Sequence, residues 1–338
     1  MLVLGIETSC DETGASVVKD GNEVISDTIA SSLEFHKKYG GVVPEIATRY
    51  HLEVIDYVVK DSLKAAGVTL EDIDLVAVTQ GPGLVGALLV GISFAKSLGY
   101  SLGIPVVGVN HLWAHIYSGL IGRPDIKFPV MGLVVSGGHT SLVLCEDIGR
   151  FRLLGQTRDD AIGEAFDKAA KILGLGYPGG PAIEKAARRG DPDAVKFTLP
   201  YLGDDSYDFS FSGIKTAVLY HVKGRKLTAE MTADIAASFQ KAAIGAVVEK
   251  AVSACVAKSR ESGKKKIDRL IVGGGVSANR LLRKELTEAG ARDGIEVIFP
   301  PMRLSLDNGA MIASTGYLLY KKGKRSGLDL TAEPNLGI

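Results

Sequence analysis

The feature that most constrains the fold of this chain is an order of strands and helices that the sequence predicts twice. In the first half, apolar segments separated by tight turns predict strands at Leu2–Glu7, Gly14–Lys19 and Glu23–Ser31. Helices and strands then alternate along the chain. They are a helix over Glu45–Ala66, a strand over Asp74–Thr79, an apolar helix over Leu84–Ala95, a strand over Val106–Val109 and a helix over His111–Leu120.

The second half repeats this order with an insertion of additional helices. Its first three strands are predicted at Val130–Ser136, Thr140–Cys145 and Arg150–Gly155. The elements after them are helices over Ile162–Leu173, Gly180–Arg189 and Thr228–Ser262, a strand over Arg269–Val272, a helix over Ala278–Ala289, a strand over Ile295–Phe299 and a helix over Leu306–Tyr320.

This order predicts an α/β fold. Three antiparallel strands followed by alternating helices and strands imply a mixed sheet with helices on both faces. Two copies imply two duplicated ribonuclease-H-like lobes with a cleft between them, the plan of the actin, sugar-kinase and heat-shock ATPase superfamily. We expect lobe one at residues 1–128, lobe two at 129–305 and, over 306–338, a C-terminal helix that returns toward lobe one.

Glycine-rich turns fall at matching places in the two copies, and the chain has 41 glycines among 338 residues. Main-chain amides in such turns can hold a phosphate. The acidic turn with Asp11 and Glu12 follows strand one of the first copy, and Ser136-Gly137-Gly138 follows strand one of the second. Either turn could instead be an ordinary hairpin that needs positive φ.

A third glycine turn, Gly273-Gly274-Gly275, joins an apolar strand to a helix, a geometry typical of nucleotide binding. It matches neither the dinucleotide fingerprint nor the P-loop. Asn279 could bind a ribose or a base, whereas Ser277 could be only the N-cap of the helix. Asp167 could likewise bind ribose hydroxyls from the second copy.

Two histidines, His111 and His115, lie four residues apart and so share one face of the predicted helix, a spacing that suits one divalent metal ion. Asp307 is the candidate third ligand. The alternative is that the histidines are hydrogen-bonded core or interface residues. The zinc-protease motif HExxH is excluded, because Leu112 and Trp113 follow His111 and no glutamate stands there.

Charge and cysteine content exclude other classes. Thirty-nine basic and 39 acidic residues give a net charge of zero, which excludes a polycation that coats nucleic acid but not a local basic patch. Three cysteines without a CxxC pair indicate a reducing compartment. Neither a signal peptide nor an apolar run of the ~20 residues needed for a membrane span is recognised, so we expect a cytoplasmic protein.

Eight segments carry a resemblance to one family: GIETSCDETG, YGGVVPEIATRYH, VNHLWAH, LVVSGGHTSLV, GEAFDKAAKILGLGYPGGP, FSFSGIKT, GGGVSANR and DNGAMIA. In this order, over nearly the whole chain, they resemble the TsaD family (formerly Gcp or YgjD). The resemblance implies the two-lobed fold and a threonylcarbamoyltransferase. That enzyme moves threonylcarbamoyl from threonylcarbamoyl-AMP to the exocyclic amine of the adenosine just after the anticodon. It acts on tRNAs that read codons beginning with A, and it releases AMP.

The resemblance also implies site residues. His111, His115 and Asp307 match the ligands of one divalent metal, Fe²⁺ or Zn²⁺. The substrate loop is matched by Val134, Val135, Ser136, Gly137 and Gly138, and nucleotide contacts by Asp167, Gly180, Glu184 and Asn279. Asp11 and Glu12 match the acidic turn at the reacting centre, with Asp11 our first choice of general base and Glu12 the second.

The resemblance is to the bacterial type. Archaeal and eukaryotic members carry a tyrosine where this chain has Val134 and an asparagine where it has His139, and the segment 35–45 is of the bacterial kind. The implied partners are therefore TsaB, which should bind lobe one, and TsaE. tRNA contacts are expected at basic residues, which could instead only solvate helix ends. These are Arg260 with Lys264–Lys266, Arg280, Arg283, Lys321, Lys322, Lys324 and Arg325.

Three rival functions are weighed against the transferase. A metalloprotease lacks its glutamate. A phosphotransferase or chaperone ATPase of the same fold would hold magnesium through carboxylates and phosphates, so the paired histidines are out of place. A non-catalytic scaffold subunit would not need His111, His115 and Asp307 together.

Overall fold

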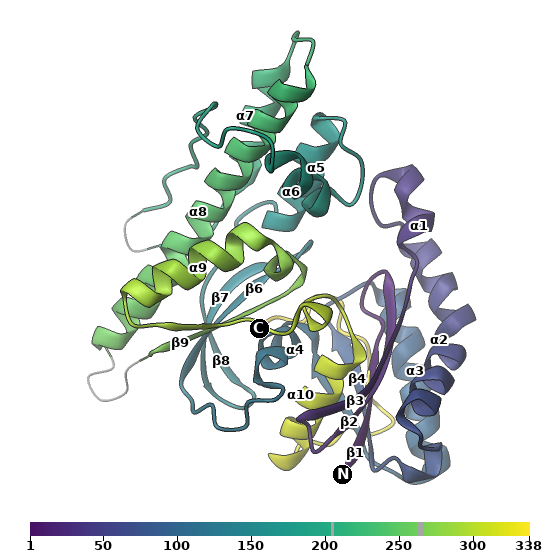
Figure 1. The fold of residues 1–338 in the computed structure, drawn as a ribbon. Coiled ribbons are helices and arrows are strands. Elements are labelled where there is room, and N and C mark those ends of the chain that lie inside the picture. Colours follow the sequence, from purple (N-terminus) through teal and green to yellow (C-terminus); the bar gives the residue numbers. More distant parts are fainter. Residues whose placement is uncertain (204–205, 262–266) are drawn as a thin grey trace. The chain divides into compact units, whose positions relative to one another are not determined.

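The computed structural model describes residues 1–203, 206–261 and 267–338 (Figure 1). The predicted tRNA contacts Lys264–Lys266 and the last residue of the predicted helix Thr228–Ser262 lie outside these residues. The chain divides into two compact units. Unit 1 comprises Met1–Lys127, Asp147–Arg150 and Pro300–Ile338, and unit 2 comprises Phe128–Glu146 and Phe151–Phe299.

Unit 1 is built on a five-stranded mixed sheet in the order β3-β2-β1-β4-β5. Its strands are β1 (Leu2–Glu7), β2 (Glu12–Lys19), β3 (Glu23–Ser31), β4 (Leu75–Gly81) and β5 (Val106–Asn110). β2 is antiparallel to both β1 and β3, whereas β1, β4 and β5 run parallel to one another. The carboxyl ends of these three parallel strands therefore lie at one edge of the sheet.

Unit 2 has a second five-stranded sheet in the order β10-β9-β6-β7-β8, which is the same order read from the other side. Its strands are β6 (Val130–Val135), β7 (Thr140–Asp147), β8 (Arg150–Gln156), β9 (Arg269–Gly273) and β10 (Glu296–Ile298). β6 is antiparallel to β7 and parallel to β9, which is parallel to β10. The predicted α/β class with two duplicated mixed sheets is thus confirmed.

Helices cover both faces of the unit 1 sheet (Figure 1). The α-helices of this unit are α1 (Leu33–His36), α2 (Pro44–Ala66), α3 (Val85–Leu102), α4 (His111–Tyr117) and α10 (Gly309–Lys321), with 3-10 turns at Lys37–Tyr39, Leu70–Asp72, Ser118–Leu120 and Met302–Leu304. One apolar core joins α2 and α3 to the sheet, and another joins α4 and α10 to its opposite face.

Unit 2 buries one large apolar core between its sheet and its helices. The helices are α5 (Ile162–Ile172), α6 (Gly179–Ala187), α7 (Ser212–Val222), α8 (Ala229–Glu261) and α9 (Arg280–Arg292), and a 3-10 turn spans Gly275–Ala278. Phe166 and Phe239, both buried, pack edge to face with ring centroids 5.1 Å apart. This contact ties α5 to the long helix α8.

Among the differences from the sequence-based prediction are α1, which was not predicted, and the three helices α7, α10 and α3. α7 was not predicted; its first amides, Phe211 N and Ser212 N, are held by the side chain of Asp159, some fifty residues earlier, as a capping group. α10 begins at Gly309 rather than Leu306, because Asn308 Oδ1 caps Met311 N. The cap of α7 is supplied from far along the chain, so it leaves no local signal in the sequence.

The third of these helices is α3, which is 18 residues long where about a dozen were predicted. Of the helices in the described residues, α3 alone is long and apolar enough, by length and composition, to cross a membrane. Leu88, Ile92 and Ala95 are nevertheless buried in the core that α2 and the sheet share. α3 therefore packs as a core helix of a compact unit.

Candidate metal centre and nucleotide-binding turns

Unit 1 gathers polar side chains at the edge where its parallel strands end, which is where α/β sheets bind their ligands. The turn after β1 and the turn after β4 are packed together there. Leu84 N donates to Ser9 O (2.8 Å), and a Cβ added to Gly83 would lie 2.6 Å from the same carbonyl. Glycine at this position therefore permits the close approach of the two turns.

The predicted metal ligands come together at this edge. His111 and His115 lie on α4, directly after β5, with their Nε2 atoms 3.1 Å apart. Asp307 Oδ1 lies 3.1 Å from His115 Nε2 and 3.7 Å from His111 Nε2. Ligand atoms from all three residues lie within 4.8 Å of one another. The sequence spacing correctly brought these residues into one cluster.

The donor set fits a small divalent ion. A tetrahedral ion at 2.0–2.1 Å from its nitrogen and oxygen ligands holds neighbouring donors about 3.3 Å apart. The observed separations of 3.1, 3.1 and 3.7 Å bracket that value. Two imidazoles and one carboxylate suit zinc or ferrous iron better than magnesium.

Helix α4 is fixed at its start by Asn110. Its Oδ1 accepts hydrogen bonds from Leu112 N (2.9 Å) and Trp113 N (3.3 Å), and its Nδ2 donates to Gly337 O (2.7 Å). The cap thus holds both histidines in register, one turn apart. Leu112 is buried, so the position of the zinc-protease glutamate is filled by a core side chain.

The position of Asp307 depends on close glycine contacts between the start of α10 and strands β1 and β2. A Cβ on Gly5 would lie 2.1 Å from Gly309 O, and a Cβ on Gly14 would lie 2.9 Å from Gly309 N. Any side chain at either position would push the start of α10 away from β1 and β2. Asn308, the residue after Asp307, caps the helix by accepting from Met311 N. The close packing therefore sets where Asp307 stands.

The charges around His111 are strongly coupled. Burial lowers its pKa, but the negative charges of Glu7 and Asp307 outweigh this and raise the pKa of His111 to about 9. Burial raises the pKa of Glu7, yet the charge of His111 and hydrogen bonds from His111 and Ser9 hold it below its ordinary value. A metal ion must displace the His111 proton, so binding releases protons.

The acidic turn lies between β1 and β2. Asp11 O accepts from Ser32 N and Ser32 Oγ, both at 2.9 Å, and Glu12 Oε1 accepts from Ser31 Oγ (3.1 Å). Burial, then the negative charges of Asp11 and Asp307, raise the pKa of Glu12 to about 10. This shift favours the protonated form of the Glu12 carboxyl at neutral pH.

His51 of α2 holds the acidic turn, and the sequence analysis gave it no role. Its Nε2 donates to Cys10 O (2.9 Å), so its Nδ1 accepts from Thr13 Oγ1 (2.7 Å). Burial lowers the pKa of His51, which keeps the ring neutral in this tautomer. A histidine on an otherwise apolar helix face was the available signal, and it lay within one of the family segments.

In unit 2, the turn after β6 has the open main chain that an anion site needs. Ser136 N donates to His139 O (2.8 Å) and His139 N to Ser136 Oγ (3.1 Å), which closes the turn. Gly137 and Gly138 are exposed, and a Cβ added to either would meet nothing within 4 Å.

Val134 and Val135, also predicted in the substrate loop, are different. Both are strand residues of β6, and both are fully buried. Their side chains belong to the interior of unit 2. Only their main-chain groups are candidates for substrate contact.

The glycine turn after β9 lies beside the turn after β6. Val134 pairs with Gly273 in the parallel register, and Gly274 has a φ of +91°. A Cβ on Gly274 would also lie 2.4 Å from Val135 O. Glycine is therefore required for its positive φ and for this close approach. The N-terminus of α5 joins them, since Gly163 N donates to Ser136 O (3.2 Å).

Asp167, Gly180 and Glu184 meet at the start of α6. Asp167 Oδ1 accepts from Gly179 N (2.6 Å), which positions the first turn of the helix. Gly180 has open space where a side chain would be. Glu184 lies one turn further, with Arg188 at 3.7 Å and Arg280 at 3.9 Å.

Asn279 is the N-cap of α9, and the alternative that Ser277 is the cap was wrong. Asn279 Oδ1 accepts from Leu281 N and Leu282 N, while its Nδ2 donates to Gln240 Oε1 (2.9 Å). Ser277 lies inside the preceding 3-10 turn, so α9 begins only at Arg280. The side-chain groups of Asn279 are thus engaged within unit 2.

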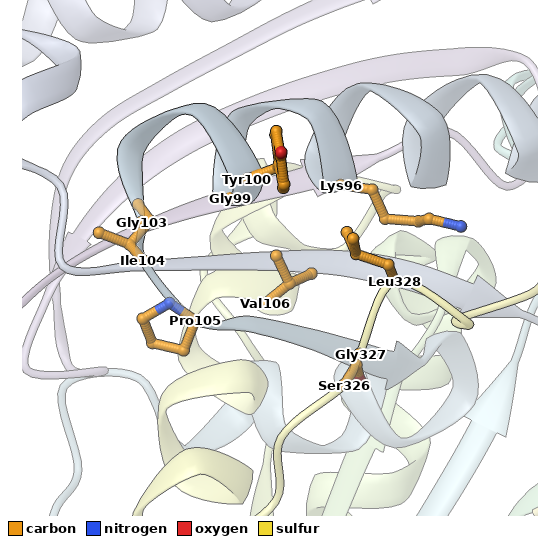
Figure 2. Close-up of a pocket in the computed structure, with 10 residues that line it drawn as sticks. All are labelled: Lys96, Gly99, Tyr100, Gly103, Ile104, Pro105, Val106, Ser326, Gly327 and Leu328. Atoms are coloured by element: carbon orange, nitrogen blue, oxygen red, sulfur yellow. The ribbon is translucent and has the colours of Figure 1, made fainter.

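A cavity of about 300 Å³ lies elsewhere in unit 1, between the end of α3 and the segment around Ser326 (Figure 2). Tyr100, Pro105 and Leu328 form much of its wall, and Lys96 stands at its rim, with its Nζ donating to Leu330 O (3.1 Å). None of the predicted site residues lines this cavity.

The fold places the chain in a known structural class. It resembles full-length HypF in a phosphate- and nucleotide-bound form (TM-score 0.61, 17% identity), covering 95% of this chain and 55% of HypF. It also resembles the (R)-2-hydroxyglutaryl-CoA dehydratase component A of Acidaminococcus fermentans (TM-score 0.52, 13% identity), covering 96% of this chain and all of that one. The protein therefore has the actin-like ATPase fold.

Sequence comparison then identifies the family. A tRNA N6-adenosine threonylcarbamoyltransferase of Clostridium botulinum (strain 657 / Type Ba4) is 51% identical over 99% of this chain and 97% of its own length. One from Symbiobacterium thermophilum is 53% identical over 100% and 97%. The family model TsaD, described by the same activity, matches residues 23–314. The chain belongs to the TsaD family, and the resemblance found in the sequence is confirmed.

Proposed function

We propose that this chain transfers the threonylcarbamoyl group from threonylcarbamoyl-AMP to the exocyclic amine of the adenosine just after the anticodon. Its tRNAs would be those that read codons beginning with A, and AMP is released. Identity of 51–53% with two bacterial threonylcarbamoyltransferases, over nearly the full length of both chains, is the observation that carries this proposal.

Unit 2 has the groups to bind the adenylate. Exposed amides of Gly137 and Gly138 at the end of β6, with the N-terminus of α5 behind them, suit the phosphate. Gly180 leaves space for the nucleoside, and Glu184, one helical turn further, would accept hydrogen bonds from its hydroxyls. Asp167 and Asn279 contribute by holding the starts of α6 and α9.

Unit 1 supplies the charged groups. His111, His115 and Asp307 would hold one Fe²⁺ or Zn²⁺, which when bound supplies a Lewis acid for a phosphate or carbonyl oxygen. The three side chains fix the position of that charge, and the buried Asn110 cap keeps α4 from shifting it.

The reaction needs a proton acceptor as well. The adenosine amine forms a bond to the carbamoyl carbon, the bond from that carbon to the AMP oxygen breaks, and the amine loses a proton. Burial and the charges of Asp11 and Asp307 raise the pKa of Glu12 to about 10, which favours Asp11 over Glu12 as the acceptor of that proton. Asp11, one residue away, is our proposed general base, and Glu12 would act as a hydrogen-bond donor in the same turn.

Partner proteins of the TsaB and TsaE type are part of the proposal, with unit 1 as the lobe that binds TsaB. Leu52 and Tyr57 of α2 and Leu89 of α3 are large apolar side chains that are exposed to solvent. The opposite side of α2, with Ile55 and Val58, is buried on the sheet. A helix with apolar residues on both sides suits a protein that packs against a partner.

tRNA is expected to contact local basic residues, and their surroundings differ. Arg283 donates to Ser277 O (2.7 Å) and stacks on Phe299, so it has a structural role. Arg280 is exposed at the start of α9. Lys322 pairs with Asp147 (2.7 Å), and Lys324 is exposed after α10. We propose a cytoplasmic enzyme, since tRNA and three free cysteines fit that compartment.

A reconstituted assay tests this proposal. The chain is incubated with threonylcarbamoyl-AMP and an unmodified tRNA, with and without TsaB and TsaE, and the modified nucleoside is measured after digestion. Transfer that depends on this chain supports the proposal. Hydrolysis of a peptide substrate in place of transfer would support the protease rival instead.

A further inference from the structure

Glu7, the last residue of β1, is a carboxylate in a place where carboxylates are rare. It is fully buried, and every other residue of β1 is apolar. A buried charge is costly unless hydrogen-bond donors and an opposite charge surround it. Its surroundings therefore show what it is used for.

Glu7 receives donors from three separate parts of unit 1. Oε1 accepts from Ser9 N (2.5 Å), and Oε2 accepts from Thr79 Oγ1 (2.6 Å) at the end of β4. Oε2 also lies 3.1 Å from His111 Nδ1. Ser9 Oγ stands 3.3 Å from the same nitrogen. The carboxylate is thus locked by the main chain and by a neighbouring strand before it meets the imidazole.

This contact decides which nitrogen of His111 can bind a metal ion. A carboxylate accepts hydrogen bonds, so Nδ1 must carry a proton. When a metal ion displaces the proton on Nε2, on the other side of the ring, the lone pair of that nitrogen points toward His115 and Asp307. The second histidine lacks such support: in the described residues, no hydrogen-bond partner is found for the buried His115 Nδ1.

We propose that Glu7 is the positioning residue of the metal centre: it holds His111 in the tautomer and ring orientation that make Nε2 a ligand. It does not touch the ion. The inference rests on the proposed metal site of this transferase, and it adds a residue that acts through His111. Carboxylates behind metal-binding histidines are a general means of raising ligand basicity and fixing the ring.

The substitution Glu7→Gln tests it, because glutamine keeps the size and one acceptor oxygen but removes the charge. Co²⁺ is titrated into chelator-treated protein and followed by visible absorption, and Zn²⁺ affinity is measured by competition with a chromogenic chelator. We expect an affinity loss of roughly 10- to 100-fold and an altered Co²⁺ spectrum. Neither readout needs tRNA or turnover, so failure of the transfer reaction would not be mistaken for failure of this inference.

Thr79→Val is the matched control. It removes a hydrogen bond to the same carboxylate and leaves the contact with His111 Nδ1 in place. We expect lower thermal stability with metal affinity within about 3-fold of the wild type, since a purely structural loss should not change the ligand set. If both variants lose affinity equally, Glu7 acts only through the stability of unit 1, and the inference is overturned.

A folded Glu7→Gln protein with wild-type affinity and an unchanged Co²⁺ spectrum would also overturn it. If Glu7→Gln does not fold, Glu7→Asp replaces it, because aspartate keeps the charge but moves it one methylene away from His111. An affinity loss with Glu7→Asp supports the inference, and wild-type affinity contradicts it. A wild-type chain that binds no Co²⁺ would overturn the metal site itself.

Discussion

The two units have the same strand order but opposite chemistry at the same edge. In unit 1, ionisable side chains lie at the carboxyl ends of β1 and β5 and at the start of β2: Glu7, His111 and Glu12. In unit 2, β6 is followed by the exposed Gly137 and Gly138, and β9 ends at the buried Gly273. The fold determines where a site can form, and the side chains at the strand ends decide what it can do.

The difference extends to how each edge tolerates change. The unit 1 residues are buried and coupled, so their protonation depends on one another. Gly137 and Gly138 of unit 2 face open space, so their contribution is geometric. A mutation in unit 1 should therefore alter charge and metal binding, whereas one in unit 2 should alter ligand access.

The largest expected effect is loss of the unit 1 ligand set. His111→Ala should abolish most metal binding and lower transfer by roughly 100- to 10,000-fold, since a Lewis acid supplies several kcal/mol. Threonylcarbamoyl-AMP binding, which we assign to unit 2, should change little. Elemental analysis and equilibrium dialysis measure the two quantities, and full metal occupancy in the variant would refute the ligand assignment.

The reciprocal change is Gly138→Ala in unit 2. The structure has room for the methyl group, so stability should hold, but the methyl group would occupy the approach to the amides. We expect threonylcarbamoyl-AMP to bind about 10-fold more weakly, the value of one hydrogen bond to a charged group. Metal content should equal that of the wild type. Unchanged affinity by calorimetry would move the phosphate away from this turn.

A smaller effect is expected at the basic residues after α10. Charge reversal at Lys321, Lys322 and Lys324 should weaken tRNA binding several-fold and make its salt dependence shallower, because fewer counterions are released. Lys322→Ala alone, which breaks the pair with Asp147, serves as the control. Filter binding at several salt concentrations gives the slope; an identical slope would leave these lysines a solvating role only.

The smallest effect concerns pH. Glu12 has a pKa near 10 when folded and an ordinary one of about 4.5 when unfolded, so the folded state binds the extra proton between those values. Stability should then fall as pH rises from 5 to 9. Glu12→Gln removes this dependence, so metal-stripped variant protein should melt a few degrees above the wild type at pH 8 and close to it at pH 5. Equal melting curves at both values would mean that Glu12 is ionised.

Local patterns predicted several strands well and placed two histidines of the candidate metal cluster on one helix. Leu2–Glu7 and Glu23–Ser31 were predicted with the bounds that the structure shows, because turn residues flank them. The spacing of His111 and His115 placed both on one helix face, and Asp307 joined them. These features depend on neighbours in sequence or on the strand order.

What the sequence did not predict depends on distant contacts. Asp159 caps a helix some fifty residues away. The role that we propose for Glu7 depends on its contacts with Thr79 and His111, which lie on other elements. Ser277 had the better local pattern for a cap, yet the 3-10 turn moved that role to Asn279. Inference from one sequence ranks residues by their local preferences. Contacts between distant parts of the folded chain can outweigh those preferences.

The glycine contact between Gly5 and Gly309 has a consequence for synthesis on the ribosome. Unit 1 contains Met1–Lys127 but also needs α10, which lies in its last segment, Pro300–Ile338. His111 leaves the ribosome roughly 200 residues before Asp307, on the order of 10–40 s at 5–20 residues per second. For that time the sheet lacks the cover of α10, and the nascent chain holds two histidines without their carboxylate. The three proposed ligands can therefore come together only after Asp307 has left the ribosome.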